Sequence, residues 1–170
     1  MRRTLLCISL ICAMLAEGAC GTAGTHTYVN NRFDVGYIAD ASLEVADKKE
    51  LAALSDSTFN CEFMVTVPTT GSALVVTTEA DAYGGEAAYL HSMVETLNAP
   101  GYSISYGEIT QAEIADEDYA ALFYTVEADG ITMAMSTYAR SEDGKLMVIN
   151  VSYNDEAELK LLLGGFAELD

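Results

Sequence analysis

Apolar and polar residues alternate in several segments of the chain, which is typical of strands with one buried face. The first alternation places Phe33, Val35 and Tyr37 on one side. A second alternation, over residues 63–67, stops at Pro68, and a further apolar run over residues 73–77 follows it. Two extended runs joined by a short polar break predict a β-hairpin.

Three longer extended runs follow in the second half of the chain, over residues 119–128, 131–140 and 145–153. The breaks between them contain Asp129-Gly130 and Asp143-Gly144. Asp-Gly pairs tolerate the positive φ of tight hairpin turns, so these runs predict an antiparallel meander. Because the runs are apolar on both sides, we expect this part of the sheet to be covered on both faces by helices.

A helical period appears in three places between and after these strands. Residues 47–54 read as a short helix or turn. Residues 81–98 place Ala87, Leu90, Val94 and Leu97 on one face. In the last helix we expect Asn154 to be the N-cap, and an apolar stripe is formed by Leu159, Leu162, Leu163 and Phe166.

The order of these elements is strand, short helix, two strands, helix, four strands, helix, since residues 102–114 also alternate. This order predicts an α+β fold, with an antiparallel sheet of about six to seven strands covered by helices. Residues 28–170 are enough for one hydrophobic core, and the sequence contains no second domain boundary.

The first 19 residues are typical of a signal peptide. Arg2 and Arg3 precede an apolar run over residues 4–16, which Glu17 ends before the chain is long enough to span a bilayer. Cys20-Gly21 then resembles the lipobox of bacterial lipoproteins, in which the cysteine is diacylated and becomes the first residue of the mature chain.

Acylation of Cys20 would anchor the domain to the outer side of the cell membrane through residues 20–27, which we expect to be a flexible tether. Glu17 departs from the lipobox pattern, so ordinary cleavage after Gly18 and secretion remain an alternative. We expect Cys61 to be a buried structural cysteine, and a Cys20–Cys61 disulfide is the alternative if Cys20 carries no lipid.

The chain is strongly acidic, with a net charge of −18. Without the leader, six basic residues remain against 25 acidic ones, which gives about −19 and argues against binding of nucleic acid. A solvated surface is the simpler explanation of this acidity. The alternative is a cation-responsive module, with clusters at residues 116–118 and at residues 154–158 as candidate sites.

The sequence contains none of the common catalytic templates, no metal-binding spacing and no cofactor motif. We therefore predict a protein that is not an enzyme. The alternative is a hydrolase with an unrecognised site around His91, with Glu95 one helical turn later. His26 lies in the expected tether and cannot be held in a fixed geometry.

Tyrosine is the residue type that best suits a recognition surface, because it combines a large apolar area with a polar tip. We single out four tyrosines in the predicted strands as candidate binding residues: Tyr106, Tyr124, Tyr138 and Tyr153.

Four short segments resemble the PsbP-like fold, which occurs in many small bacterial lipoproteins. They are Asn30–Phe33, Tyr89-Leu90 in the middle helix, Asp143–Lys145 and the closing Gly165-Phe166. The resemblance implies a non-enzymatic accessory module that docks with a partner. Together with the leader, it predicts a membrane-tethered extracytoplasmic protein that binds another protein or a small ligand.

Overall fold

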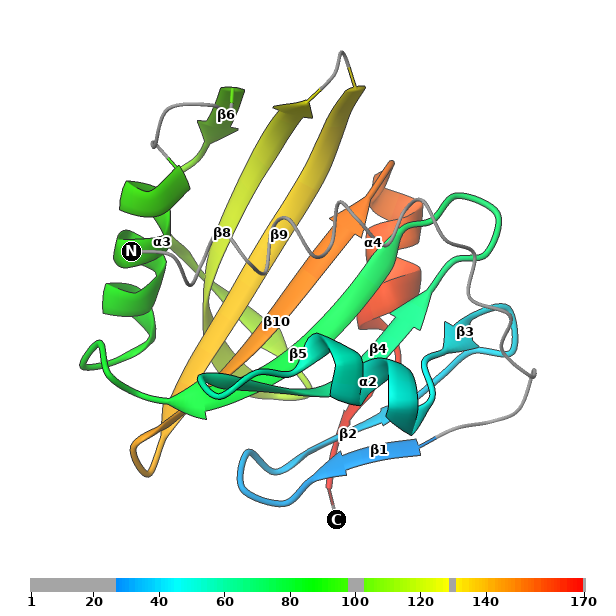
Figure 1. Cartoon of the computed structure of the whole chain (residues 1–170), viewed down its shortest axis with the longest axis horizontal. Coiled ribbons are helices and arrows are strands. Elements are labelled where there is room, and N and C mark those ends of the chain that lie inside the picture. Colours follow the sequence, from blue (N-terminus) through cyan, green and yellow to red (C-terminus); the bar gives the residue numbers. More distant parts are fainter. Residues whose placement is uncertain (1–26, 98–102, 129–130, 170) are drawn as a thin grey trace.

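The computed structural model describes residues 27–97, 103–128 and 131–169, and the chain is α+β as predicted (Figure 1). The helices are α2 (Lys48–Leu54), α3 (Glu86–Leu97) and α4 (Glu156–Leu163). The strands are β1 (Thr27–Asn30), β2 (Val35–Ile38), β3 (Glu44–Val45), β4 (Phe59–Thr66), β5 (Ala73–Ala80), β6 (Ser103–Tyr106), β7 (Thr110–Ile114), β8 (Glu117–Ala128), β9 (Ile131–Glu142), β10 (Lys145–Tyr153) and β11 (Phe166–Glu168).

The strands form two antiparallel sheets. The large sheet has eight strands in the order β3-β4-β5-β10-β9-β8-β6, with β7 also paired to β8. The prediction of an antiparallel sheet is therefore confirmed, and the predicted six to seven strands fall short of this number. A second sheet of three strands, in the order β1-β2-β11, was not predicted. Its strands are short, and β11 is contributed by the end of the chain.

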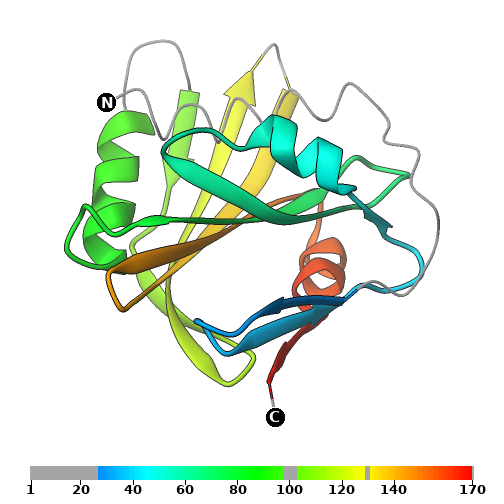
Figure 2. The same cartoon turned by 60° about the horizontal axis from the view of Figure 1, so that its bottom comes forward.

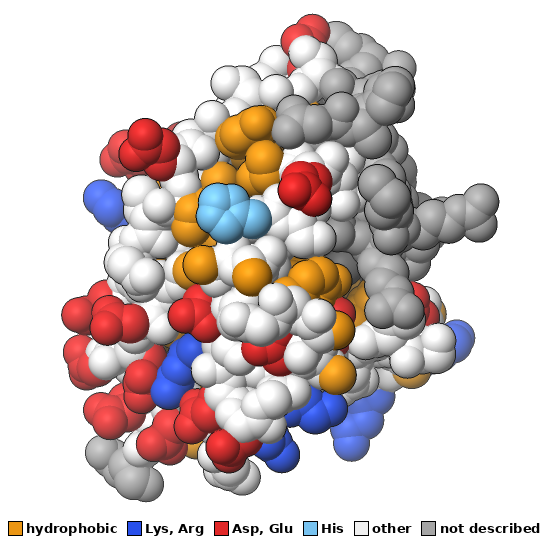
Figure 3. All heavy atoms as spheres, turned by 90° about the vertical axis from the view of Figure 1, so that its left-hand side faces the viewer, with side chains coloured by type: hydrophobic (Ala, Val, Ile, Leu, Met, Phe, Trp, Pro, Cys, Tyr) orange, Lys and Arg blue, Asp and Glu red, His pale blue; other side chains and the backbone are white. Residues whose placement is uncertain are grey.

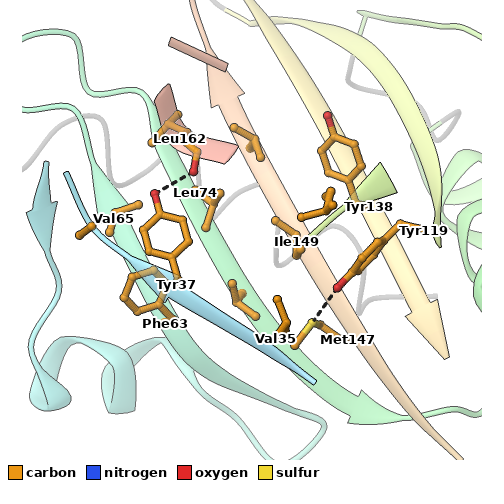
Figure 4. Packing of buried hydrophobic residues seen from close by; sticks show 14 of the residues in the cluster. Val35, Tyr37, Phe63, Val65, Leu74, Tyr119, Tyr138, Met147, Ile149 and Leu162 are labelled. Carbon is orange, nitrogen blue, oxygen red and sulfur yellow. Dashed lines mark hydrogen bonds between the residues drawn. The ribbon is translucent and has the colours of Figure 1, made fainter. Parts of the chain in front are cut away.

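The two faces of the large sheet are covered by different elements (Figure 2). On one face, α2 and α3 pack over a core that includes Leu90, Met93 and Leu122. On the other face, the three-stranded sheet and α4 pack over a core that includes Tyr37, Leu74 and Ile149, part of which is drawn in Figure 4. Helices therefore lie on both faces as predicted, but on this second face α4 shares the cover with the three-stranded sheet, which was not predicted.

A β-bulge between Cys61 and Phe63 changes which positions of β4 face each core. Before the bulge, Cys61 points to the α2–α3 side, and after it Phe63 and Val65 point to the three-stranded sheet. Their shared face confirms the alternation predicted for residues 63–67. An extra residue in one strand shifts the side-chain alternation, which accounts for the change of face.

The turns of the meander follow the predicted chemistry where the structure describes them. Asp143 and Gly144 have φ values of 48° and 70°, as a tight hairpin between β9 and β10 requires. Asp129-Gly130 lies outside the described residues. The turn before β8 consists of Ala115 and Asp116, at φ values of 53° and 58°, and β8 begins at Glu117, two residues before the extended run predicted from residue 119.

Asp47 caps α2 in a reciprocal capping box with Glu50, which explains why this short helix forms. The buried face of α3 is rotated from the predicted one. Its buried residues are Tyr89, Leu90, Met93 and Leu97, while Ala87 is exposed.

Helix α4 is capped by Asp155, whose side chain accepts from two backbone N–H groups, so the predicted N-cap Asn154 was wrong by one residue. The predicted stripe also ran too far, because α4 ends at Leu163 and Phe166 begins β11. The chain leaves the helix at Gly164 and returns along β2, which completes the three-stranded sheet.

The first predicted strand is shifted as well. The strands are β1 and β2, and Phe33 lies in the turn that joins them. Strand β1 begins at Thr27, which the prediction placed at the end of the tether. The predicted signal peptide and residues 20–26 of the predicted tether lie outside the described residues.

Candidate functional site

The four candidate tyrosines divide between the two faces of the large sheet. Tyr106 of β6 and Tyr124 of β8 are cross-strand partners, and Tyr124 belongs to the core beneath α2 and α3. Tyr138 belongs to the opposite core, against which Tyr153 also packs. The structure therefore does not bring the four together into one surface.

On the α2–α3 side, Tyr124 is part of a polar strip, which we define as Tyr106, Tyr124, Thr137 and Asn150. The hydroxyl oxygens of Tyr124 and Thr137 are 3.4 Å apart, and Thr137 donates a hydrogen bond of 2.8 Å to Oδ1 of Asn150. The strip crosses β6, β8, β9 and β10, and the three inner residues lie within an otherwise apolar core.

Only one end of the polar strip is accessible. Tyr124, Thr137 and Asn150 are each at most 4% exposed, whereas Tyr106 on the edge strand β6 is 43% exposed. Burial of a hydrogen-bonded network makes its geometry rigid, so the three inner residues form a fixed support within the core. Tyr106 is the member of the strip that a partner can contact.

Sequence reasoning missed Thr137 and Asn150. The signal for Asn150 was present, because it is a lone amide within the apolar run of β10, and a buried amide requires hydrogen-bond partners. Thr137 carried no such signal, since threonine is common in strands.

On the opposite face, Phe123 is 40% exposed and lies edge-on against Tyr138, with ring centroids 6.0 Å apart. Tyr138 is only 2% exposed, so the exposed ring of Phe123 packs against a buried ring. Burial raises the pKa of both Tyr138 and Tyr153 above that of free tyrosine, so both hydroxyls are neutral at physiological pH. This face has one exposed aromatic ring but no described counterpart of the polar strip.

His91 lies on the outer surface of α3 and is exposed, as is Glu95 one turn later. Figure 3 looks onto this surface, where the histidine side chain stands out among apolar side chains. A catalytic base is normally oriented by surrounding groups, and the geometry of an exposed helix position does not provide them.

The acidic clusters have structural roles in the described part of the chain. Glu117 forms an ion pair of 3.0 Å with Arg140, and Asp116 lies in the turn before β8. Asp155 caps α4, and Glu158 accepts a hydrogen bond of 2.5 Å from Ser72.

Burial raises the pKa of Glu158, but hydrogen bonds from Ser72 and Asn154 outweigh this effect, so the pKa lies below its ordinary value. Within the described ranges, no three His, Cys, Asp or Glu side chains converge as metal ligands do.

Glu62, at the bulge in β4, joins the two sheets. Its carboxylate accepts hydrogen bonds from the Tyr28 hydroxyl at 2.6 Å, from Asn30 at 2.8 Å and from Thr78 at 2.6 Å. Burial, together with this carboxylate, raises the pKa of Tyr28. Tyr28 also stacks on Phe63 at a centroid distance of 5.2 Å. This arrangement was not predicted, because β1 and its pairing were not predicted either.

Cys61 is 4% exposed in the core beneath α2 and α3. Burial raises the pKa of its thiol to about 11, so the thiol is neutral and unreactive at physiological pH. The prediction of a buried cysteine is confirmed, while Cys20, its alternative disulfide partner, lies outside the described residues. No helix in residues 27–97, 103–128 or 131–169 has the length and apolar character needed to cross a bilayer.

Comparison with known proteins shows similarity in fold and not in sequence. No model of a protein family matches the chain, and no curated protein matches it. The chain superposes on the solution structure of cyanobacterial PsbP (CyanoP) from Synechocystis sp. PCC 6803 with a TM-score of 0.58 and 13% identity, covering 89% of this chain and 96% of that one. The predicted PsbP-like fold is therefore confirmed.

A second similar structure is the crystal structure of LpqN, described as involved in cell envelope biogenesis of Mycobacterium tuberculosis. The match has a TM-score of 0.37 and 15% identity, and covers 91% of this chain and 88% of that one. A superposition this loose does not establish a common fold.

Proposed function

We propose that this PsbP-like domain is an exported lipoprotein, acylated at Cys20, that binds a protein or small ligand without catalysing a reaction. One observation carries the proposal: Cys20-Gly21 directly follows an apolar leader, and only residues 21–26 separate this cysteine from the first strand of the domain. A short leader, an acceptor cysteine and a short linker are the arrangement that a surface lipoprotein needs.

The polar strip supports the binding part of this proposal. Tyr106 places an accessible aromatic ring at the edge of the sheet, beside the hydrogen-bonded Tyr124, Thr137 and Asn150. Rigid aromatic side chains contribute binding area at a low cost in conformational entropy. The exposed position of His91 on α3 likewise favours a binding protein over a hydrolase.

The anchoring part is tested by fractionation. We expect the wild-type protein to be found with the membrane and the Cys20→Ala variant to be found in the soluble extracytoplasmic fraction. Recovery of both proteins in the same fraction would contradict anchoring through Cys20.

The binding part is tested by photo-crosslinking in the native envelope. A photoreactive phenylalanine analogue replaces Tyr106 in one variant and Phe123 in a control, because these aromatic residues are 43% and 40% exposed on opposite faces of the sheet. We expect a discrete cross-linked product from position 106 and none from position 123. Equal products from both positions, or no product from position 106, would contradict binding at the polar strip.

A further inference from the structure

The outer side of the three-stranded sheet is apolar. Side chains alternate along its strands, so Val35 and Tyr37 point into the core while Val29 and Ile38 point away from it. Val29 and Ile38 are 49% and 54% exposed. They are two of the five large hydrophobic residues in the described part of the chain that are strongly exposed.

The centre of this surface is Gly36, which lies opposite Val29 in β1 and Ala167 in β11. A Cβ added at Gly36 would be 3.0 Å from Cδ2 of Leu169, so the Leu169 side chain lies over this glycine on the outward side. We define the outer apolar face as Val29, Gly36, Ile38, Ala167 and Leu169. None of its members is charged, although the chain has a net charge of −18.

The outer apolar face is also the part of the domain that begins closest to Cys20 in the sequence. Strand β1 starts at Thr27, only six residues (21–26) after this cysteine. Even fully extended, the backbone from Cys20 to Thr27 spans at most about 25 Å. Figure 2 shows β1 and β2 at the outer edge of the molecule, on the far side from α2 and α3.

We propose that the outer apolar face rests on the surface of the lipid bilayer to which Cys20 is anchored. The inference rests on the proposed acylation of Cys20, which would hold β1 within reach of the headgroups. Transfer of half-exposed aliphatic side chains from water to the boundary between headgroups and acyl chains lowers the free energy.

Charge is compatible with the same orientation. A strongly anionic body is repelled by any anionic headgroups, and the members of the outer apolar face add no charge to this repulsion. The turn between β1 and β2 at the border of this face carries both an exposed Arg32 and an exposed Asp34, and Glu168 of β11 is exposed as well.

The test uses the full chain, purified from membranes with its lipid and reconstituted in phosphatidylcholine vesicles. A nitroxide spin label is attached to Val29→Cys or Ile38→Cys, with Phe123→Cys as the matched control on the large sheet, where the exposed fraction of Phe123 is 40%. Cys61 is buried and remains unlabelled. The collision rates of each label with a water-soluble relaxation agent and with oxygen, which concentrates in lipid, are then measured.

We expect labels at positions 29 and 38 to lose access to the water-soluble agent and to gain access to oxygen, whereas the label at 123 remains open to water. If intact mass shows an acylated Cys20 and positions 29 and 38 are as accessible to water as 123, the membrane contact is wrong and the lipoprotein proposal stands. Protection of all three positions would also overturn the assignment to this face. If Cys20 carries no lipid, both proposals are wrong.

Discussion

Replacing Gly165 by alanine tests how the three-stranded sheet closes over the core. Gly165 follows α4 and lies against β2, where its carbonyl accepts a hydrogen bond of 2.8 Å from the Ile38 N–H. An added Cβ would lie 2.5 Å from Cζ of Tyr37 and 2.7 Å from the carbonyl oxygen of Ile38. The Tyr37 ring is fully buried and cannot swing away (Figure 4), and the Ile38 carbonyl is backbone.

The cost follows from these contacts. Overpacking of a tight core costs about 1–3 kcal/mol, and loss of the Gly165–Ile38 hydrogen bond adds about 1 kcal/mol. We therefore expect Gly165→Ala to lower the free energy of unfolding by about 3 kcal/mol, which corresponds to a fall of about 6–12 °C in Tm for a domain of this size.

The assay is urea unfolding of the two purified variants Gly165→Ala and Gly107→Ala, followed by circular dichroism. Gly107 is the matched control because the nearest atom to its added Cβ is the carbonyl oxygen of Phe123, at 3.8 Å, which is an ordinary contact. We expect Gly107→Ala to unfold at the wild-type midpoint or slightly above it. Equal midpoints for the two variants would refute the close approach of Gly165 to Tyr37.

Three further predictions concern buried or hydrogen-bonded groups. The Tyr37 hydroxyl donates a hydrogen bond of 2.7 Å to the Leu162 carbonyl, so Tyr37→Phe should lower the free energy of unfolding by about 1–2 kcal/mol in urea titrations; an unchanged midpoint would contradict this. A hydrogen bond from Ser141 lowers the pKa of Asp81, and three backbone N–H groups do the same. The ionised Asp81 carboxylate therefore stabilises the folded state above the unfolded pKa of about 4, and this stabilisation is lost as pH falls through the native pKa. Asp81→Asn should therefore destabilise the domain at neutral pH and make the loss of Tm in acid shallower, and parallel Tm–pH curves would contradict this. Because burial raises the pKa of Cys61 to about 11, we expect no reaction with a disulfide reagent in the native state and full reaction in urea, and rapid labelling of the native protein would show that the thiol is exposed.

Local chemistry explains which parts of the fold could be predicted from the sequence. Asp143-Gly144 defined a hairpin because few residue pairs adopt two successive positive φ values without strain. Ala115 and Asp116 also have two successive positive φ values, but alanine is not a typical turn residue. The start of β8 was therefore missed. The alternation over residues 63–67 was visible because Phe63, Val65 and Val67 share one buried face.

The three-stranded sheet could not be predicted, for a different reason. Its outer strands, at residues 27–30 and 166–168, are too short to show alternation, and they meet only through β2. Phe166 looks like one more apolar position of α4, and only the return of the chain at Gly164 separates it from the helix.

The candidate binding residues were limited in the same way. Alternation indicates which residues share a face, but four tyrosines on several strands require the sheet order before their faces can be compared. With the order known, Tyr106 and Tyr124 fall on one side and Tyr138 on the other. The exposure of Tyr106 depends on β6 being an edge strand, which no local pattern reveals.

The central claim is that the chain is exported and held at a membrane through Cys20. Intact-mass spectrometry of the protein purified from its own cells tests this most directly. We predict a mature chain that begins at Cys20 and carries the mass of a diacylglyceryl group. A chain that still begins at Met1, or one that begins at Ala19 without lipid, would contradict the claim.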